Sequence, residues 1–167
     1  RPIDVLLLID VSGSMQGRLR ASLYGLGVLE SALTLGGLEP AYTVVRFAKA
    51  RGVTGSGVRG VDVGTPVTSV DSIQRILQYP AVGDERLLDA IAAGLASPSR
   101  QGVPRIAVII TDEPPSGDST DIDAVVQMMG ATTVRFYALM PQTGVGGDPA
   151  LRALTAAVDA TGGETFV

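Results

Sequence analysis

A short polar turn follows the first long apolar run of this chain. Residues 5–9 are all apolar, and the turn after them supplies the carboxylate of Asp10 and the hydroxyls of Ser12 and Ser14 at alternate positions. Carboxylate and hydroxyl oxygens are hard ligands that suit Mg²⁺, with Mn²⁺ and Ca²⁺ as alternatives. Gly13 lets the turn between the serines close tightly. The spacing predicts part of a metal site, whose other ligands must come from elsewhere in the chain.

The elements that must position this turn alternate along the sequence. Apolar runs predict strands, and apolar residues spaced by three or four predict helices. The expected strands cover 3–9, 42–47, 58–63, 105–111, 133–139 and 164–167, and the expected helices cover 18–35, 71–77, 86–97, 120–129 and 148–160. Strands that are apolar on both faces and separated by helices indicate a mostly parallel central sheet with helices on both faces. We therefore expect one α/β domain over 1–167, doubly wound and Rossmann-like.

A second strand also ends in an acidic turn. The run over 105–111 leads directly into Asp112. In doubly wound sheets, ligands bind beyond the carboxyl ends of the strands, where the strand order reverses. If the strands before Asp10 and Asp112 are neighbours at that point, both carboxylates meet the two serine hydroxyls in one crevice.

These two motifs resemble those of a known family. The sequence DVSGS over 10–14 resembles the metal-ion-dependent adhesion site of von Willebrand factor A domains, and IITDE over 109–113 resembles the fourth-strand motif of that family. The resemblance covers essentially the whole chain and implies a metal-dependent module for protein–protein interaction. It assigns Asp10, Ser12, Ser14 and Asp112 to Mg²⁺, and an acidic side chain of a protein partner to the remaining coordination position.

The fifth ligand departs from the commonest pattern of the family. Many members carry a threonine in a Gly-x-Thr-x-Leu-x-x-Ala-like loop, and the matching stretch here, 83–91, places Glu85 at that position. This resembles the variant seen in integrin β-type domains, so the resemblance implies Glu85 as the fifth ligand. Asp84, Thr65 and Thr68 could take its place. A third carboxylate would strengthen metal binding, because ligand charge raises affinity.

The composition excludes several classes of function. The chain of 167 residues has no cysteine and no histidine, which excludes disulfides, thiolate nucleophiles, zinc ribbons and Ser-His-Asp hydrolases. Its net charge of −4 and the absence of basic runs argue against binding to nucleic acid or an anionic membrane surface, and no apolar run is long enough to span a membrane. The pattern G-x-G-x-x-G over 55–60 neither follows a strand directly nor opens a helix, so we do not interpret it as a dinucleotide site.

Two different functions compete with the adhesion-type module. A phosphatase similar to the haloacid dehalogenases would use Asp10 as its nucleophile, but this chain has Ser12 where that family needs a second aspartate as acid and base. The second competing function is that of a module with the same fold whose interactions do not depend on the metal. We expect a binding module rather than an enzyme.

The remaining expectations concern the parent protein. The chain begins at Arg1 without methionine, which suggests a module excised from a longer protein, and its preference for arginine over lysine suggests a GC-rich bacterial genome. The lack of cysteine is compatible with a cytoplasmic protein. No feature of the sequence specifies an oligomeric state.

Overall fold

The computed structural model describes residues 1–47, 60–77, 86–141 and 147–167. Over these ranges the chain forms a mixed α/β structure around a six-stranded sheet of order β3-β2-β1-β4-β5-β6. The strands are β1 (Pro2–Asp10), β2 (Glu39–Phe47), β3 (Val61–Val63), β4 (Arg105–Ile110), β5 (Arg135–Leu139) and β6 (Glu164–Phe166). The helices are α1 (Leu19–Leu35), α2 (Val70–Ile76), α3 (Leu87–Ala96), α4 (Ile122–Gly130) and α5 (Pro149–Ala160), with a short 3-10 turn η1 (Ser14–Gly17) before α1.

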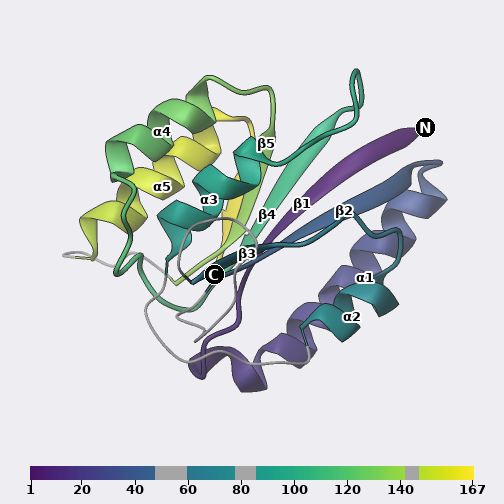
Figure 1. The fold of residues 1–167 in the computed structure, drawn as a ribbon, viewed down its shortest axis with the longest axis horizontal. Coiled ribbons are helices and arrows are strands. Elements are labelled where there is room, and N and C mark those ends of the chain that lie inside the picture. Colours follow the sequence, from purple (N-terminus) through teal and green to yellow (C-terminus); the bar gives the residue numbers. More distant parts are fainter. Residues whose placement is uncertain (48–59, 78–85, 142–146) are drawn as a thin grey trace.

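Helices cover both faces of the sheet, as the apolar strands predict. Figure 1 shows α3, α4 and α5 on one side of the strands and α1 and α2 on the other. Strand β1 contributes to both layers, because Leu6 and Leu8 pack into the cluster with α3 to α5, whereas Leu7 and Ile9 pack into the cluster with α1 and α2. A strand that is buried on both faces needs apolar side chains at successive positions, which explains the continuous run in the sequence.

The register of the central strands brings two polar turns to the same edge. Strand β1 pairs in parallel with β2 on one side and with β4 on the other, and Ile9 lies opposite Ile110. From β1 the strands β2 and β3 are added toward one side of the sheet, and the strands β4, β5 and β6 are then added toward the other side. The strand order therefore reverses between β1 and β4. The residues that follow Ile9 and Ile110 therefore leave the sheet side by side, as expected for a ligand-binding edge.

The expected elements match the observed ones to within a few residues. The helix expected over 120–129 begins at Ile122, because the side chain of Asp121 accepts a hydrogen bond from the amide of Asp123 and caps it. Asp148 caps α5, with Pro149 in the first turn, as the sequence predicts. Of the edge strand expected over 58–63, residues 58 and 59 lie outside the described residues, and β3 covers Val61–Val63 and pairs antiparallel with β2.

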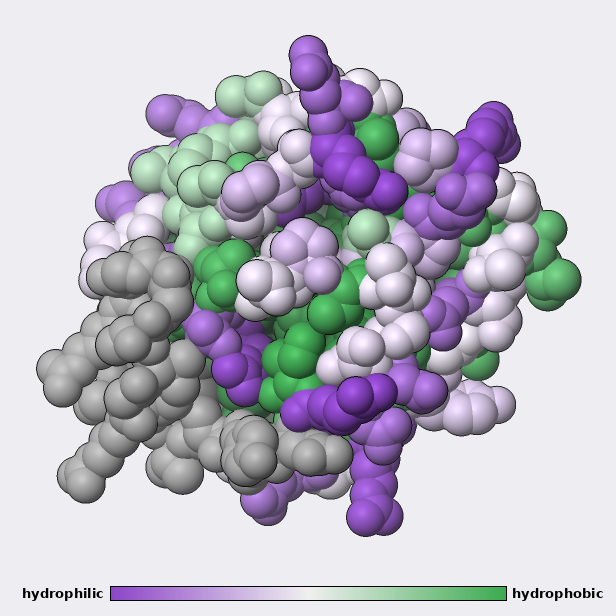
Figure 2. Space-filling view, turned by 45° about the vertical axis from the view of Figure 1, so that its right-hand side comes forward, coloured by the Kyte–Doolittle hydropathy of each residue, from purple (hydrophilic) through white to green (hydrophobic). Residues whose placement is uncertain are grey.

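The surface of the described residues carries hydrophilic side chains together with several exposed large hydrophobic ones, among them Tyr24 and Leu35. On the face in Figure 2, hydrophilic residues project outward, and the hydrophobic residues near the centre of the view are recessed between them. None of the helices in the described ranges is both long and apolar enough to cross a membrane.

Candidate functional site

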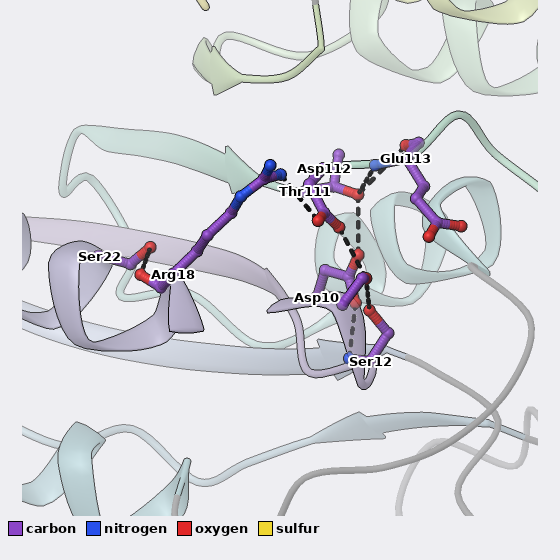
Figure 3. A network of polar contacts seen from close by, with 8 residues as sticks. Asp10, Ser12, Arg18, Ser22, Thr111, Asp112 and Glu113 are labelled. Atoms are coloured by element: carbon purple, nitrogen blue, oxygen red, sulfur yellow. Dashed lines mark hydrogen bonds and ion pairs between the residues drawn. The ribbon is translucent and has the colours of Figure 1, made fainter. Parts of the chain in front are cut away.

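Asp10 lies at the end of β1 with its side chain held from two directions. Its Oδ1 accepts a hydrogen bond of 2.7 Å from the backbone amide of Ser12, and its Oδ2 accepts one of 2.9 Å from the hydroxyl of Thr111. The residue is fully buried, at 0% exposure. One donor from the turn after β1 and one from the residue that follows β4 therefore fix the orientation of this carboxylate at the edge of the sheet (Figure 3).

The two serines connect Asp10 to the turn after β4. Ser14 donates a hydrogen bond of 3.0 Å from its hydroxyl to Oδ1 of Asp112, and the hydroxyl oxygens of Ser12 and Ser14 are 2.8 Å apart. Because Ser14 uses its only hydroxyl hydrogen on Asp112, Ser12 is the donor of the bond between the serines. Both hydroxyl oxygens thus keep lone-pair capacity that a cation can use.

The donor set fits the expected magnesium ion. The side-chain atoms of Asp10, Ser12, Ser14 and Asp112 that could ligate a metal are all hard oxygens. No arginine among the described residues forms an ion pair with the buried carboxylate of Asp10. A buried carboxylate is costly unless a cation or hydrogen bonds compensate it, so a bound cation would stabilise this arrangement. The described ranges hold no group of three or more aspartate, glutamate, histidine or cysteine side chains arranged to hold a metal ion. Within these ranges, the carboxylates of the hydrogen-bonded cluster are those of Asp10 and Asp112.

The structure brings four of the five expected ligands together. Glu85, the fifth, and Asp84, its neighbour and possible substitute, lie outside the described residues. Thr65 and Thr68, which could also take the place of Glu85, are exposed and flank Val67, which pairs with Tyr42. Tyr42 lies opposite Val5, five residues before Asp10, which is about 16 Å along the strand. The two threonines are therefore far from the candidate site.

Sequence reasoning missed two residues of this site. Thr111 is buried and orients Asp10, and its position between the apolar run of β4 and Asp112 is the signal that could have identified it. Arg18 donates a hydrogen bond of 2.8 Å from Nη1 to Oδ2 of Asp112. No local pattern in the sequence indicates that contact, since it joins residues 94 positions apart.

A second polar network supports the loop that follows Asp112. Asp89, 2% exposed and near the start of α3, accepts hydrogen bonds from the amides of Ser119 and Thr120 and from the hydroxyl of Thr120. Burial by itself would raise the pKa of Asp89, but these hydrogen bonds and one from Arg86 outweigh it and lower that pKa. These hydrogen bonds attach the loop to the start of α3.

Asp118 belongs to the same network, but its pKa is shifted in the opposite direction from that of Asp89. Its Oδ1 accepts a hydrogen bond of 2.9 Å from the amide of Asp89, whereas its buried Oδ2 has no hydrogen-bond partner among the residues that the structure describes. Burial, together with the neighbouring charge of Asp89, raises the pKa of Asp118 to about 6. Asp118 thus attaches the loop after β4 to the first turn of α3.

A hollow of about 460 Å³ adjoins the candidate site. Arg18 and Asp112 contribute charged groups to its wall, and most of the remaining lining is apolar, including Met15, Ile110 and Leu139.

Comparisons with known proteins identify the fold only. No family model matches the chain, and no curated protein sequence matches it. Among solved structures, the pilus adhesin SpaC from Lactobacillus rhamnosus GG in its open conformation aligns with a TM-score of 0.73 and 14% identity, over 100% of this chain and 28% of the adhesin chain. A second structure of SpaC gives 0.70 with 14% identity, over 99% and 28%.

A mussel protein shares the same architecture. Proximal thread matrix protein 1 from the mussel byssus aligns with a TM-score of 0.64 and 13% identity, over 98% of this chain and 41% of that chain. The chain thus spans less than half the length of the structures that it resembles, and identities this low establish a shared fold alone.

Proposed function

We propose that this chain is a von Willebrand factor A-type module, with the doubly wound fold of that family, that binds Mg²⁺ and docks a protein partner through an acidic side chain. One observation carries the proposal. Asp10, Ser12, Ser14 and Asp112, separated by up to 102 positions in the sequence, form one hydrogen-bonded cluster where β1 and β4 leave the sheet. The strand order reverses at this edge, which is where ligands bind in such sheets.

The residues of the cluster have distinct roles in this proposal. Asp10, Ser12 and Ser14 hold the ion, Asp112 contributes a carboxylate from the turn after β4, and Thr111 keeps Asp10 oriented. A bound Mg²⁺ supplies a fixed positive charge and a coordination position that a partner carboxylate fills. The chain offers oxygen ligands and no histidine or cysteine, so the site suits docking rather than the acid–base chemistry of a hydrolase.

Metal binding is the first test of this proposal. Mg²⁺ at millimolar concentration should shift the backbone amide resonances of 10–14 and 111–113, and Mn²⁺ should broaden the same resonances. Ser14→Ala should weaken Mg²⁺ binding in calorimetry, whereas Ser31→Ala should not, because the Ser31 hydroxyl bonds to Gly27 within α1. Unchanged resonances at saturating Mg²⁺ would refute the metal site.

Partner binding is the second test. Capture of a protein partner should be lost when Mg²⁺ is chelated and should return when it is restored. Retention of the partner without metal would contradict the metal-dependent mechanism and support metal-independent binding. Turnover of a chromogenic phosphate ester that Asp10→Asn abolishes would contradict the assignment as a binding module.

A further inference from the structure

An ion pair joins the start of the first helix to the candidate metal site. Arg18 directly precedes α1 and donates from Nη1 to Oδ2 of Asp112 at 2.8 Å. The other oxygen of this carboxylate accepts the hydroxyl hydrogen of Ser14 at 3.0 Å. The carboxylate of Asp112 thus lies between the guanidinium of Arg18 and the hydroxyl of Ser14, which we assign to the metal. Figure 3 shows the side chain of Arg18 extended from the start of α1 toward Asp112.

Helix stability does not account for an arginine at this position. Arg18 is the N-cap residue of α1, its side chain makes no capping hydrogen bond, and the first turn of α1 contains no acidic residue. The N-terminus of a helix carries a partial positive charge, which disfavours a cation there. The contact with Asp112 is therefore the interaction that holds the guanidinium at the site.

The guanidinium keeps capacity for another anion. The Arg18 side chain is 66% exposed, whereas that of Asp112 is 10% exposed. Among the described contacts, Nη1 is the one nitrogen of this side chain that donates to a protein group. The other N–H donors remain available, and a guanidinium binds carboxylates through paired N–H groups.

We infer that Arg18 is a second, resident cation of the docking site, which weakens the binding of Mg²⁺ and strengthens the binding of the partner's acidic group. This inference rests on the proposed function and specifies how the same site selects its ligand. Like charges repel, so the guanidinium opposes the incoming metal ion, and it attracts the carboxylate that follows. Neutralising Arg18 therefore changes two affinities in opposite directions, which a structural role alone would not do.

The test measures both affinities in one set of variants. Mg²⁺ binding is measured by calorimetry for the wild type, Arg18→Gln, Arg18→Lys and Arg20→Gln. Arg20 is exposed two positions further along α1, so its replacement makes the same change in net charge outside the ion pair. The probe for the second affinity is a blocked tripeptide with a central glutamate, titrated into Mg²⁺-saturated protein and followed by amide chemical shifts. The same tripeptide with glutamine is its control.

The expected results have opposite signs. Arg18→Gln should bind Mg²⁺ several-fold more tightly and the glutamate tripeptide about two- to fivefold more weakly than the wild type, in line with exposed charge pairs. Arg18→Lys should lie nearer the wild type in both measurements, and Arg20→Gln should match it. The glutamine tripeptide should not bind detectably to any of the four proteins.

Each contrary result has a separate meaning. Arg18→Gln that matches Arg20→Gln in both affinities would overturn the role of Arg18 and leave the metal site intact. Wild-type protein that binds Mg²⁺ but not the glutamate tripeptide would also overturn it. Failure of the wild type to bind Mg²⁺ would instead refute the proposed function.

Discussion

Replacement of Asp89 by asparagine should strongly destabilise the protein, although Asp89 is not an expected metal ligand. Both of its oxygens accept hydrogen bonds from the loop after β4. Oδ1 accepts from the amides of Ser119 and Thr120 and from the hydroxyl of Thr120, and Oδ2 accepts from the amide of Ser119 and from Nη1 of Arg86. Asparagine can keep only one of these two acceptor atoms. Its amino group would then face the donor groups that now bind Oδ2.

The contacts define the size of the effect. Loss of the charge-assisted hydrogen bond with Arg86 costs about 1.5–3 kcal/mol, and the buried donor left without an acceptor adds about 1–3 kcal/mol. We therefore expect Asp89→Asn to lower the free energy of unfolding by about 3 kcal/mol at neutral pH. That is a large fraction of the roughly 5–15 kcal/mol that stabilises a typical domain.

The same reasoning predicts a dependence on pH. The pKa of Asp89 is lowered in the folded protein, so its ionised form contributes stability above the ordinary value of 3.8, and that contribution is lost as the pH falls through the folded pKa. Asparagine does not titrate. The stability difference between wild type and Asp89→Asn should therefore be largest at neutral pH and should shrink in acid.

Urea denaturation at several pH values measures both effects. Asp121→Asn is the matched control, because Asp121 lies in the same part of the chain and caps α4, and asparagine caps a helix as well as aspartate does. It should change the free energy of unfolding by less than about 0.5 kcal/mol. A loss below about 1 kcal/mol for Asp89→Asn, or a difference that does not shrink in acid, would refute this account of the network.

Three further predictions concern separate features. Gly163→Ala should destabilise the protein by several kcal/mol in thermal unfolding, because a Cβ atom there would lie 1.4 Å from the carbonyl oxygen of Phe136. Gly130→Ala should be neutral or stabilising, because a Cβ atom there would meet no described atom within 4 Å beyond its chain neighbours and the backbone of its own helix. Asp118→Asn should raise stability above pH 6, because the pKa of Asp118 is raised to about 6 and the folded state therefore loses stability as the pH rises from 3.8 to that value. The melting temperature of the variant should accordingly change less across this pH range than that of the wild type. If Glu85 is a metal ligand, Glu85→Thr should weaken Mg²⁺ binding in calorimetry through the loss of a negative charge, and unchanged or tighter binding would contradict that role.

The sequence alone predicted most elements of the fold, because their signals are local. The apolar run over 5–9 predicted a buried strand, and the three- and four-residue spacing of leucines predicted the helix observed over Leu19–Leu35. The capping residue Asp148 and the following proline marked the start of α5. The predicted boundaries were less accurate where a strand leads into a turn. Thr111 was expected to end a strand, but β4 ends at Ile110, and the hydroxyl of Thr111 donates a hydrogen bond to Asp10.

The candidate site divides in the same way between local and tertiary information. The types and spacing of Asp10, Ser12 and Ser14 suffice to predict a cluster of hard oxygen ligands. The sequence could suggest that Asp112 joins them only on the condition that β1 and β4 are neighbours, and the strand order and register meet that condition.

Only the tertiary structure decided which groups surround those ligands. The contact of Arg18 with Asp112 and that of Asp89 with Thr120 join residues 94 and 31 positions apart. Neither pair leaves a periodic pattern in the sequence, because each depends on how a loop lies against a helix after the sheet has formed. Residue chemistry therefore specified which oxygen atoms this edge of the sheet presents, and packing specified which charged groups lie beside them.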